Sequence, residues 1–569
     1  MKTSFFQFRV GLLALFFLTS RLPGAAQAPA WQSARAVAVA TGATNDASEV
    51  TATAVDAAGN VYLAGNFTNT VVLGGTTLTS LGSYDVFVAK FNPTSNQFVW
   101  AQRAGGTGTD AVSALAVSGT SVYVAGGFDS PTAGFGPTTL SNAGGADVFI
   151  ARLLDAGTTG NFVWAQRAGG SGSDQPFALA VSGTSVYVTG FYSGSTAGFG
   201  ATILTSVGAF DIFVAKLTDA GNTSSFVWAQ RAGGTGNEAA LALAVSGTSV
   251  YVAGGFDSST AGFGPTTLTN TRAGTADVFV AKLTDAGNFV WAQQAGGTGD
   301  DGARTLAVRG TNVYLAGGFD SPTAGFGSAT LANADANTGT DDLFVAKVTE
   351  VGNTGSFVWA QRAGGPGYDN ATALAVSGSS VYLAGSFDSP TAGFGTTTLT
   401  SAGIEDVFMT KLTDAGSTGS FVWAQRAGGS SSDNATSLAI SGTIIYVVGT
   451  LFSLASDFSA ITLANPSPGP YSPLGFLASL TDPALTATTA PAGPREPAAL
   501  YPNPARRTAT LRLPAGTAPA PLVLTDAQGR TVRRYPAPAG AEAALDLTGL
   551  PTGLYLLRGA GPAQRLVVE

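Results

Sequence analysis

The chain has 569 residues, of which 45% are hydrophobic and 11% are charged, and its formal net charge is −8. It contains no cysteine and no histidine, which excludes disulfides, thiol nucleophiles, cysteine or imidazole metal sites, and the Ser-His-Asp and Cys-His mechanisms. Residues 29–494 carry 15 basic and 30 acidic side chains. We therefore expect this part to repel nucleic acid and anionic lipid, and neither is an expected partner.

The first residues have the pattern of a secretory signal peptide. Lys2 and Arg9 precede an apolar run over 10–18, and small residues follow at Ala26 and Ala28. This order predicts a signal peptide over residues 1–28, with cleavage after Ala28 or after Ala26. The apolar run is too short to span a bilayer. We expect an exported mature chain with no integral membrane segment.

A repeat of roughly 64 residues follows the leader. Within one repeat, apolar runs bounded by Gly, Ser, Thr, Asn and Asp predict strands over 114–117, 122–128, 147–153 and 162–169. Four short strands repeated seven times predict an all-β fold, a seven-bladed β-propeller of four-stranded blades over residues 29–482. One tryptophan and one tyrosine recur in each repeat, and we expect them to pack between neighbouring blades. They are Trp31, Trp100, Trp164, Trp228, Trp291, Trp359 and Trp423, and Tyr62, Tyr123, Tyr187, Tyr251, Tyr314, Tyr382 and Tyr446.

The two ends of the array have complementary defects. The last repeat has no fourth strand of its own, whereas Trp31 opens a strand-like segment that precedes the first complete repeat. An N-terminal strand that completes the last blade would close the ring and pair both exposed sheet edges. The sequence therefore predicts closure by the N-terminal strand.

A second, small domain is predicted at the C-terminal end. Residues 483–497 are rich in Pro, Ala and Thr, which is typical of a semi-extended linker, and residues 498–569 contain turn signals between short apolar runs that predict an antiparallel β-sandwich. Four features carry a resemblance: Tyr501-Pro502-Asn503-Pro504, Asp526-Ala527-Gln528-Gly529, Gly553-Leu554-Tyr555 and a basic-then-aliphatic end. In this order they resemble the type A C-terminal sorting domain of the type IX secretion system of Bacteroidetes.

That resemblance implies passage through the outer membrane of a Gram-negative bacterium, with the type IX secretion machinery as a partner. The cargo is then released or attached to the cell surface. The repeats themselves resemble the bacterial seven-bladed β-propeller repeat family, most clearly over residues 56–65. That family is defined by its fold and implies no shared reaction.

Acidic residues recur at three positions of the repeat, and we expect all three sets on the face where the long connections emerge. They lie before the first strand (Asp110, Asp174, Glu238, Asp301, Asp369, Asp433), after the second (Asp129, Asp257, Asp320, Asp388) and at the start of the third (Asp85, Asp147, Asp211, Asp277, Asp342, Asp406). Three interpretations remain open. The carboxylates cap turns and pair with basic side chains, as Asp147 would with Arg152 or Arg167; they hold Ca²⁺; or a pair of them catalyses glycoside hydrolysis.

Few residues break the repeat. The departures in or near loops are Tyr192, Phe210, Arg304, Tyr368 and Glu405. If such residues gather with carboxylates in one pocket, the arrangement favours a lectin or an enzyme, whereas a uniform face favours multivalent adhesion or a structural role. We expect a non-enzymatic propeller that binds a polysaccharide or a protein through its long-connection face and requires no cofactor. A carboxylate-dependent polysaccharide-degrading enzyme and an inert surface structural protein are the alternatives.

Overall fold

The computed structural model describes residues 28–41, 46–335, 339–466, 472–485, 499–512, 521–526, 528, 530–538, 542–558 and 564–569. These residues form strands and turns and contain no helix, so the all-β prediction is confirmed. It follows that none of them belongs to a helix of the length and hydropathy needed to cross a membrane. The predicted signal peptide up to residue 27 and the predicted linker from residue 486 lie outside the described residues.

Each of repeats 1 to 6 contributes four antiparallel strands that pair in chain order, as in β9-β10-β13-β14, and repeat 7 contributes three. The first strands of repeats 1 to 7 are β3 (Ser48–Val55), β9 (Asp110–Ser118), β15 (Gln175–Ser182), β21 (Glu238–Ser246), β27 (Asp301–Arg309), β33 (Asp369–Ser377) and β39 (Asp433–Ser441). The second strands are β4 (Val61–Phe67), β10 (Ser121–Phe128), β16 (Ser185–Ser193), β22 (Ser249–Phe256), β28 (Asn312–Phe319), β34 (Ser380–Phe387) and β40 (Ile444–Leu451). The third strands are β7 (Asp85–Asn92), β13 (Asp147–Asp155), β19 (Phe210–Asp219), β25 (Asp277–Thr284), β31 (Asp342–Val351), β37 (Asp406–Asp414) and β43 (Leu474–Thr481). The fourth strands of repeats 1 to 6 are β8 (Gln97–Gly106), β14 (Gly160–Gly170), β20 (Ser224–Ala232), β26 (Phe289–Ala295), β32 (Thr354–Ala363) and β38 (Gly419–Gly429).

The N-terminal strand completes the last repeat. β1 (Trp31–Val37) pairs with β43, which gives the order β1-β43-β40-β39 and confirms the predicted closure. The register corrects the prediction that Trp31 is one of the repeated tryptophans. Ser33 lies opposite Ser479, whereas Trp31 lies opposite Leu480. In repeat 1 the corresponding pairs are Trp100 with Lys90 and Phe98 with Phe91. Trp31 therefore occupies the position of the repeated phenylalanine, and Ser33 occupies that of the repeated tryptophan.

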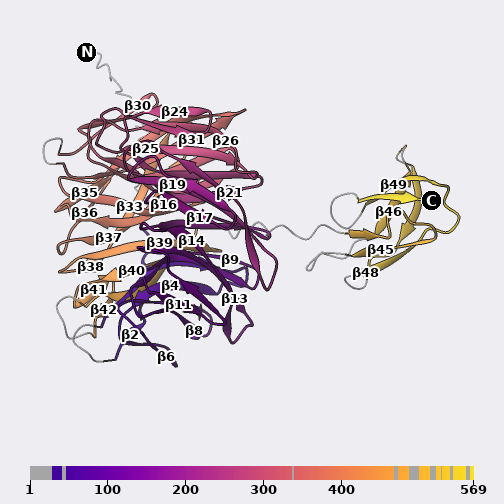
Figure 1. Cartoon of the computed structure of the whole chain (residues 1–569), viewed down its shortest axis with the longest axis horizontal. Helices are drawn as coiled ribbons and strands as arrows, with labels where there is room; N and C mark the ends of the chain where they lie inside the picture. The colour runs from indigo at the N-terminus through magenta and orange to yellow at the C-terminus, as the bar shows by residue number, and fades with distance from the viewer. Residues whose placement is uncertain are drawn as a thin grey trace, which may run out of the picture.

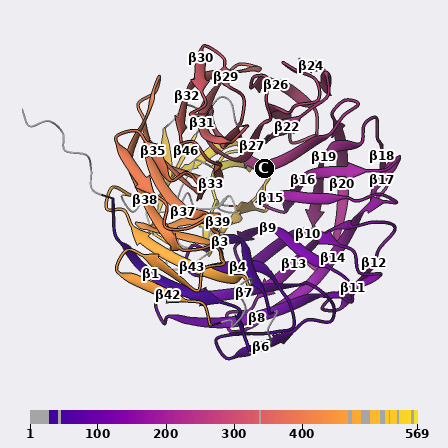
Figure 2. The same cartoon turned by 90° about the vertical axis from the view of Figure 1, so that its left-hand side faces the viewer.

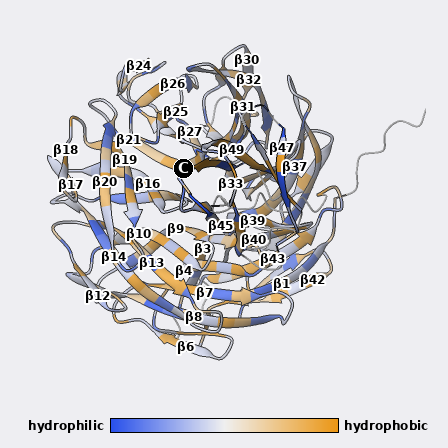
Figure 3. Ribbon diagram, turned by 90° about the vertical axis from the view of Figure 1, so that its right-hand side faces the viewer, coloured by the Kyte–Doolittle hydropathy of each residue, from blue (hydrophilic) through white to orange (hydrophobic). Residues whose placement is uncertain are grey.

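The repeats surround a common centre. The first strands contact one another in sequence from β3 to β39, and β39 contacts β3 again. Figure 2 shows this arrangement, in which the sheet of each repeat extends outward from its first strand. Hydrophobic stretches run along strands such as β4 and β13 (Figure 3). Their side chains form cores between the sheets of neighbouring repeats. The arrangement is consistent with a β-propeller (Figure 1).

The long connection between second and third strands contains a hairpin, which the apolar pattern of the repeat does not predict. In repeat 2 the hairpin consists of β11 (Thr132–Phe135) and β12 (Thr138–Ser141), and β11 pairs with β8 of repeat 1. Ala133 and Phe135 are fully buried and Gly136 turns the hairpin at φ +57°. The other hairpins are β5 (Thr70–Leu73) with β6 (Thr76–Thr79), β17 (Thr196–Phe199) with β18 (Thr202–Thr205), β23 (Thr260–Phe263) with β24 (Thr266–Thr269), β29 (Thr323–Phe326) with β30 (Ala329–Ala332), β35 (Thr391–Phe394) with β36 (Thr397–Thr400), and β41 (Ala455–Phe458) with β42 (Ile461–Ala464). Each extends the sheet of the preceding repeat, and β5 does so through β2 (Val39–Ala40).

A polar clasp joins each of the first six repeats to the next, and it is largely buried except at Asp285. Asp155 of repeat 2 accepts hydrogen bonds from three side chains of repeat 1, Lys90 Nζ at 2.7 Å, Tyr62 Oη at 2.6 Å and Trp100 Nε1 at 3.0 Å. Burial acts to raise the pKa of Asp155, but these hydrogen bonds outweigh burial and hold the pKa below its usual value. The residues that replace Asp155 in the following clasps are Asp219, Asp285, Glu350, Asp414 and Asp482. The repeated tyrosines of repeats 1 to 6, and the tryptophans Trp100, Trp164, Trp228 and Trp359, therefore serve as polar anchors as well as packing groups.

The seam between repeat 7 and repeat 1 lacks this clasp. The strand register places Ser479 at the position of Lys90 and Ser33 at the position of Trp100. Pro93 stands at the position of Asp155, where the other repeats carry an acidic residue. The two serine hydroxyls hydrogen bond to each other at 2.7 Å. Leu485, beyond the predicted propeller boundary at 482, is buried in the core of repeat 7.

The C-terminal residues form two antiparallel sheets around a core of their own, which contains Leu511, Leu524, Leu545 and Tyr555. One sheet has the order β44-β45-β48, from Ala499–Tyr501, Thr508–Arg512 and Glu542–Asp546. The other has the order β47-β46-β49-β50, from Thr531–Tyr535, Leu522–Asp526, Gly553–Arg558 and Gln564–Val568.

The resemblance motifs lie at the turns and edges of these sheets. Tyr501 Oη donates to Glu542 at 2.8 Å, and the Asn503 side chain bonds to the backbone of Arg565 and Val567. The bonds Tyr501–Pro502 and Asn503–Pro504 are cis. Tyr555 Oη donates to Pro551 O at 2.7 Å, whereas Gly529 lies outside the described residues.

Candidate ligand-binding pocket

The carboxylates that precede the first strands accept hydrogen bonds from the turns beside them. Asp110 Oδ2 accepts hydrogen bonds from Gly106 N at 2.6 Å and from Ser130 Oγ at 2.7 Å. The neighbouring Gly105 has φ +135°, and a Cβ there would lie 2.6 Å from Asp85 Oδ1 and 2.8 Å from Asp110 Oδ2. Only glycine fits between the two carboxylates. Acidic residues of two sets and two repeats thus converge at one turn, as the topology predicted.

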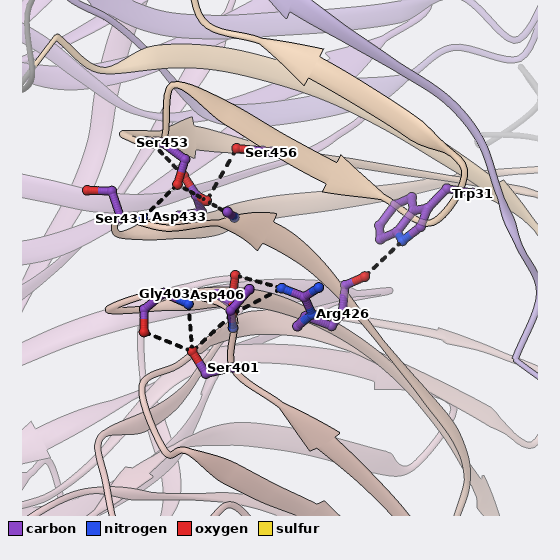
Figure 4. A network of polar contacts seen from close by, with 11 residues as sticks. Trp31, Ser401, Gly403, Asp406, Arg426, Ser431, Asp433, Ser453 and Ser456 are labelled. Carbon is purple, nitrogen blue, oxygen red and sulfur yellow. Dashed lines mark hydrogen bonds and ion pairs between the residues drawn. The ribbon is translucent and has the colours of Figure 1, made fainter.

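Five of the six carboxylates that open the third strands pair with arginines, and Asp277 is the exception. Asp147 pairs with Arg167 at 2.9 Å, whereas Arg152 pairs with Asp219 in the next clasp. Figure 4 shows the same arrangement in repeat 6, where Asp406 meets Arg426 and the nearby Asp433 accepts hydrogen bonds from serine hydroxyls. In these turns the carboxylates act as caps and ion-pair partners.

Exposure separates the candidate carboxylates into two groups. Asp110, Asp147, Asp174, Asp301, Asp369 and Asp433 are at most 1% exposed. Asp129, Asp257, Asp320 and Asp388 are exposed or half-buried, and each accepts a backbone N–H from the turn of the same repeat. Among the described residues, no group of three or more Asp or Glu side chains is arranged to hold a metal ion. Calcium binding at these residues stays a prediction.

A β-bulge occurs in every first strand, near the end where these turns lie. The extra residue is Thr51, Ser113, Phe177, Leu241, Arg304, Thr372 and Thr436 in repeats 1 to 7. Thr51 Oγ1, Thr372 Oγ1 and Thr436 Oγ1 donate to carbonyls of the following repeat's first strand at 3.0, 2.7 and 2.6 Å. A bulge re-aims a side chain, so repeats 3, 4 and 5 present three large, unlike side chains at the position where other repeats carry a hydroxyl.

A cavity of about 400 Å³ opens beside these three repeats. Leu241 and Arg304 line the cavity from the bulges. Ala239 and Gly302 leave space in it, because the flanking repeats 3 and 6 carry the larger Gln175 and Asn370 at the same position. A Cβ added at Gly302 would meet no atom within 4 Å. The pocket therefore exists because repeats 4 and 5 carry small side chains between larger neighbours.

Two phenylalanines form the apolar wall of the pocket. The rings of Phe191 and Phe210 lie 4.7 Å apart at an interplanar angle of 62°, and Phe177 packs on Phe191 at 5.7 Å. Phe210 is 37% exposed. An exposed aromatic surface of this kind can pack against an apolar ligand face.

The pocket also has an acidic wall. It is formed by Glu238, Asp257, Asp300, Asp301 and Asp341. Arg304 Nε donates to Asn370 Oδ1 at 3.1 Å, and Asn370 Nδ2 donates to Asp341 Oδ2 at 2.9 Å. Burial is the main cause that raises the pKa of Asp301 to about 7. The pocket thus combines an aromatic surface with a strongly acidic one.

Some pocket residues were predicted from the sequence and others were missed. Phe210 and Arg304 stood out as departures from the repeat and line the pocket, whereas Tyr192 is fully buried and Tyr368 is exposed elsewhere. Asp300 and Asp341 were missed. Their signal is the doubled aspartate at 300–301 and 341–342, which no other repeat carries.

Repeat 4 has also lost an arginine near the pocket. Gln294 stands at the position of Arg103, and its amide bonds to the backbone of Thr269, so Asp277 has no arginine partner among the described residues. Burial raises the pKa of Asp277. Gln294→Arg is expected to restore the pair and raise the unfolding free energy by about 1 kcal/mol, as urea unfolding would measure. Gln293→Arg, one residue earlier, is the control, and equal gains from both variants would contradict the pairing.

The buried carboxylates predict a stability maximum at mildly acidic pH. Burial raises the pKa of Asp301 to about 7 and those of Asp174 and Asp369 to about 6. A carboxyl with a raised folded-state pKa contributes stability below its unfolded pKa and loses it as pH rises through the folded value. We expect the unfolding free energy to fall by roughly 1–3 kcal/mol between pH 5 and pH 8. Thermal unfolding followed by circular dichroism measures this change.

The clasp carboxylates Asp155, Asp285, Asp414 and Asp482, whose pKa values are lowered, stay ionised throughout that range and should not mask the effect. Asp301→Asn mimics the protonated form and should reduce the fall. A melting temperature that rises steadily from pH 5 to pH 8 would contradict the prediction.

Comparison with known proteins bears first on the C-terminal sheets. Residues 499–567 match the secretion system C-terminal sorting domain. This is the domain that the resemblance predicted, and it supports secretion or attachment to the outer surface through the type IX system. The sorting domain covers only the C-terminal end of the chain. A comparison of the whole sequence with curated proteins finds no match.

Solved structures similar to the chain include two bacterial proteins. A putative 6-phosphogluconolactonase from Bacteroides uniformis ATCC 8492 has a TM-score of 0.38 and 11% identity, over 74% of this chain and 96% of that chain. A putative 6-phosphogluconolactonase from Bacteroides fragilis NCTC 9343 has a TM-score of 0.36 and 10% identity, over 74% of this chain and 94% of that chain. Likeness at this level carries no argument about activity.

Proposed function

We propose that this chain is an exported seven-bladed β-propeller that binds an extracellular polysaccharide through the pocket of repeats 3 to 5, while the sorting domain directs its secretion. The protein is not an enzyme under this proposal and needs no cofactor. The sorting domain supports the secreted or surface location. The strand pairing of the repeats and the closure by β1 support the blade count.

One observation carries the binding proposal. Four of the residues that break the repeat, Phe191, Phe210, Leu241 and Arg304, line one cavity together with carboxylates. Saccharide sites combine an aromatic surface for the C–H face of the ring with polar groups for its hydroxyls. A repeat that served only as a scaffold would have no reason to concentrate its departures there.

A glycan-array screen of the purified full-length chain tests this proposal, with calcium and with chelator in parallel. Saturable binding to one class of glycan is the expected result. Loss of binding in chelator would assign a role to calcium. An array without any binding would contradict the polysaccharide proposal and leave a protein partner or an inert structural role.

A second candidate is a carboxylate-dependent polysaccharide-degrading enzyme. It is favoured by Asp301, a buried carboxyl in the pocket wall whose raised pKa suits a general acid. Release of reducing ends from a bound glycan, lost in Asp301→Asn, would establish it. Stable binding without turnover would leave the non-enzymatic function in place.

A further inference from the structure

The acidic wall of the pocket has an excess of uncompensated charge. Asp257, Asp300 and Asp341 line it together with the single cation Arg304, and none of these three carboxylates forms an ion pair with any described residue. In contrast, the clasps and most turns of the fold pair an acid with Lys or Arg. This part of the protein therefore carries negative charge that the fold itself does not neutralise.

Two of these carboxylates keep one oxygen available. Asp300 Oδ1 accepts Ala276 N at 2.7 Å and Asp341 Oδ2 accepts Asn370 Nδ2 at 2.9 Å, while the second oxygen of each accepts no hydrogen bond from the described residues. Their charges also reach Asp320, whose pKa is raised first by burial and then by Asp300 and Asp341. Asp300 is exposed and Asp341 is half-buried, so both are open to a ligand.

The positive groups nearby are already engaged or lie at the rim. Arg304 is exposed and donates to Asn370, and Arg272 donates to Thr298 O at 3.3 Å. Neither Arg304 nor Arg272 forms an ion pair with a described acid. An added cation would therefore gain attraction from several carboxylates without displacing an internal partner.

Resting on the proposed function, we propose that the pocket recognises an amino sugar with a free ammonium group, presented by a cationic polysaccharide. The ammonium lies against Asp300 and Asp341, and the C–H face of the ring packs on Phe191 and Phe210. An ammonium near an aromatic face gains a further cation–π attraction. A neutral or N-acetylated sugar would gain the packing but would leave the carboxylates unpaired.

Isothermal titration calorimetry of the full-length chain tests this assignment with two ligands of equal length, a β-1,4-linked glucosamine hexamer and its fully N-acetylated form. The glucosamine hexamer should bind at least about tenfold more tightly, and its affinity should fall as salt is added. The double variant Asp300→Asn, Asp341→Asn should lose about tenfold or more of this affinity. Asp129→Asn, at the position in repeat 2 that corresponds to Asp257, is the matched control and should bind as the parent does.

Each outcome decides between the claims. Equal or tighter binding of the acetylated hexamer overturns the cationic ligand while the polysaccharide-binding function stands. Preference for glucosamine that the double variant retains overturns the assignment to Asp300 and Asp341. Binding of a lysine oligomer as tightly as glucosamine overturns the sugar in favour of a basic peptide. If neither hexamer binds and the glycan array is also blank, both the inference and the proposed function fail.

Discussion

Replacing Asp155 with alanine is expected to lower the unfolding free energy by about 3–5 kcal/mol, because the change leaves the Lys90 ammonium buried without its counter-charge. Tyr62 and Trp100 lose the same acceptor, and Lys90 is only 7% exposed. Urea unfolding followed by tryptophan fluorescence measures the loss. Broken buried ion pairs are among the costliest single changes in a folded protein.

The seam between repeats 7 and 1 provides the matched control. Ser479 occupies the lysine position there and bonds only to Ser33. Ser479→Ala should therefore cost about 1 kcal/mol or less. A loss as large as that of Asp155→Ala would show that the position matters for packing and that the clasp does not carry the stability. A small loss for Asp155→Ala would contradict the account of the clasp directly.

Filling the pocket at Gly302 is expected to abolish ligand binding. A Cβ at this position meets no atom within 4 Å, so Gly302→Leu places its side chain in the cavity without a clash at the backbone. Since the cavity measures about 400 Å³, one leucine removes much of the room that a sugar ring needs. We expect affinity to fall by about a hundredfold or more in calorimetry with the glycan that the array selects.

Gly75→Leu is the control for this variant, because Gly75 also has open space beside it and lies in a hairpin of repeat 1. It should bind as the parent does, and both variants should keep the parent's melting temperature within a few degrees. Binding that survives Gly302→Leu would place the ligand elsewhere on the molecule.

The repeated part of the fold was predictable because the same signals occur in every repeat. Strand positions and closure by the N-terminal strand follow from apolar runs bounded by turn residues and from the two complementary ends. The expected turn-capping role of the aspartates also agrees with the observed hydrogen bonds, for example at Asp110 and Asp147. Local sequence and global architecture agree in these elements.

The strand register could not be predicted where the sequence diverges from the repeat. Trp31 is a tryptophan near the expected position, yet pairing with β43 places it at the repeated phenylalanine. The apolar pattern does not predict the hairpin between second and third strands, because its strands have only four residues each and β11 contains a glycine. Its pairing with the preceding repeat depends on contacts between repeats that a local pattern does not encode.

The pocket was the least predictable feature, although two of its residues were noticed. Phe177, Leu241 and Arg304 hold the same position of the repeat, but a β-bulge leaves no mark in the apolar pattern, so the sequence does not show that these residues lie at bulges. The hollow also depends on the absence of side chains at Ala239 and Gly302, which sequence reading counts as ordinary small residues. Three-dimensional register is what brings these departures to one place.

The most direct test of the central claim is a crystal structure of the chain with the glycan that the array selects. The account predicts one saccharide per chain, seated against Phe191 and Phe210 between repeats 3 and 5, with carboxylates of Asp300 and Asp341 within hydrogen-bonding distance. Saccharide density at equivalent turns of several repeats, or at another surface with this pocket empty, would contradict a single specialised site and favour multivalent adhesion by the repeated face.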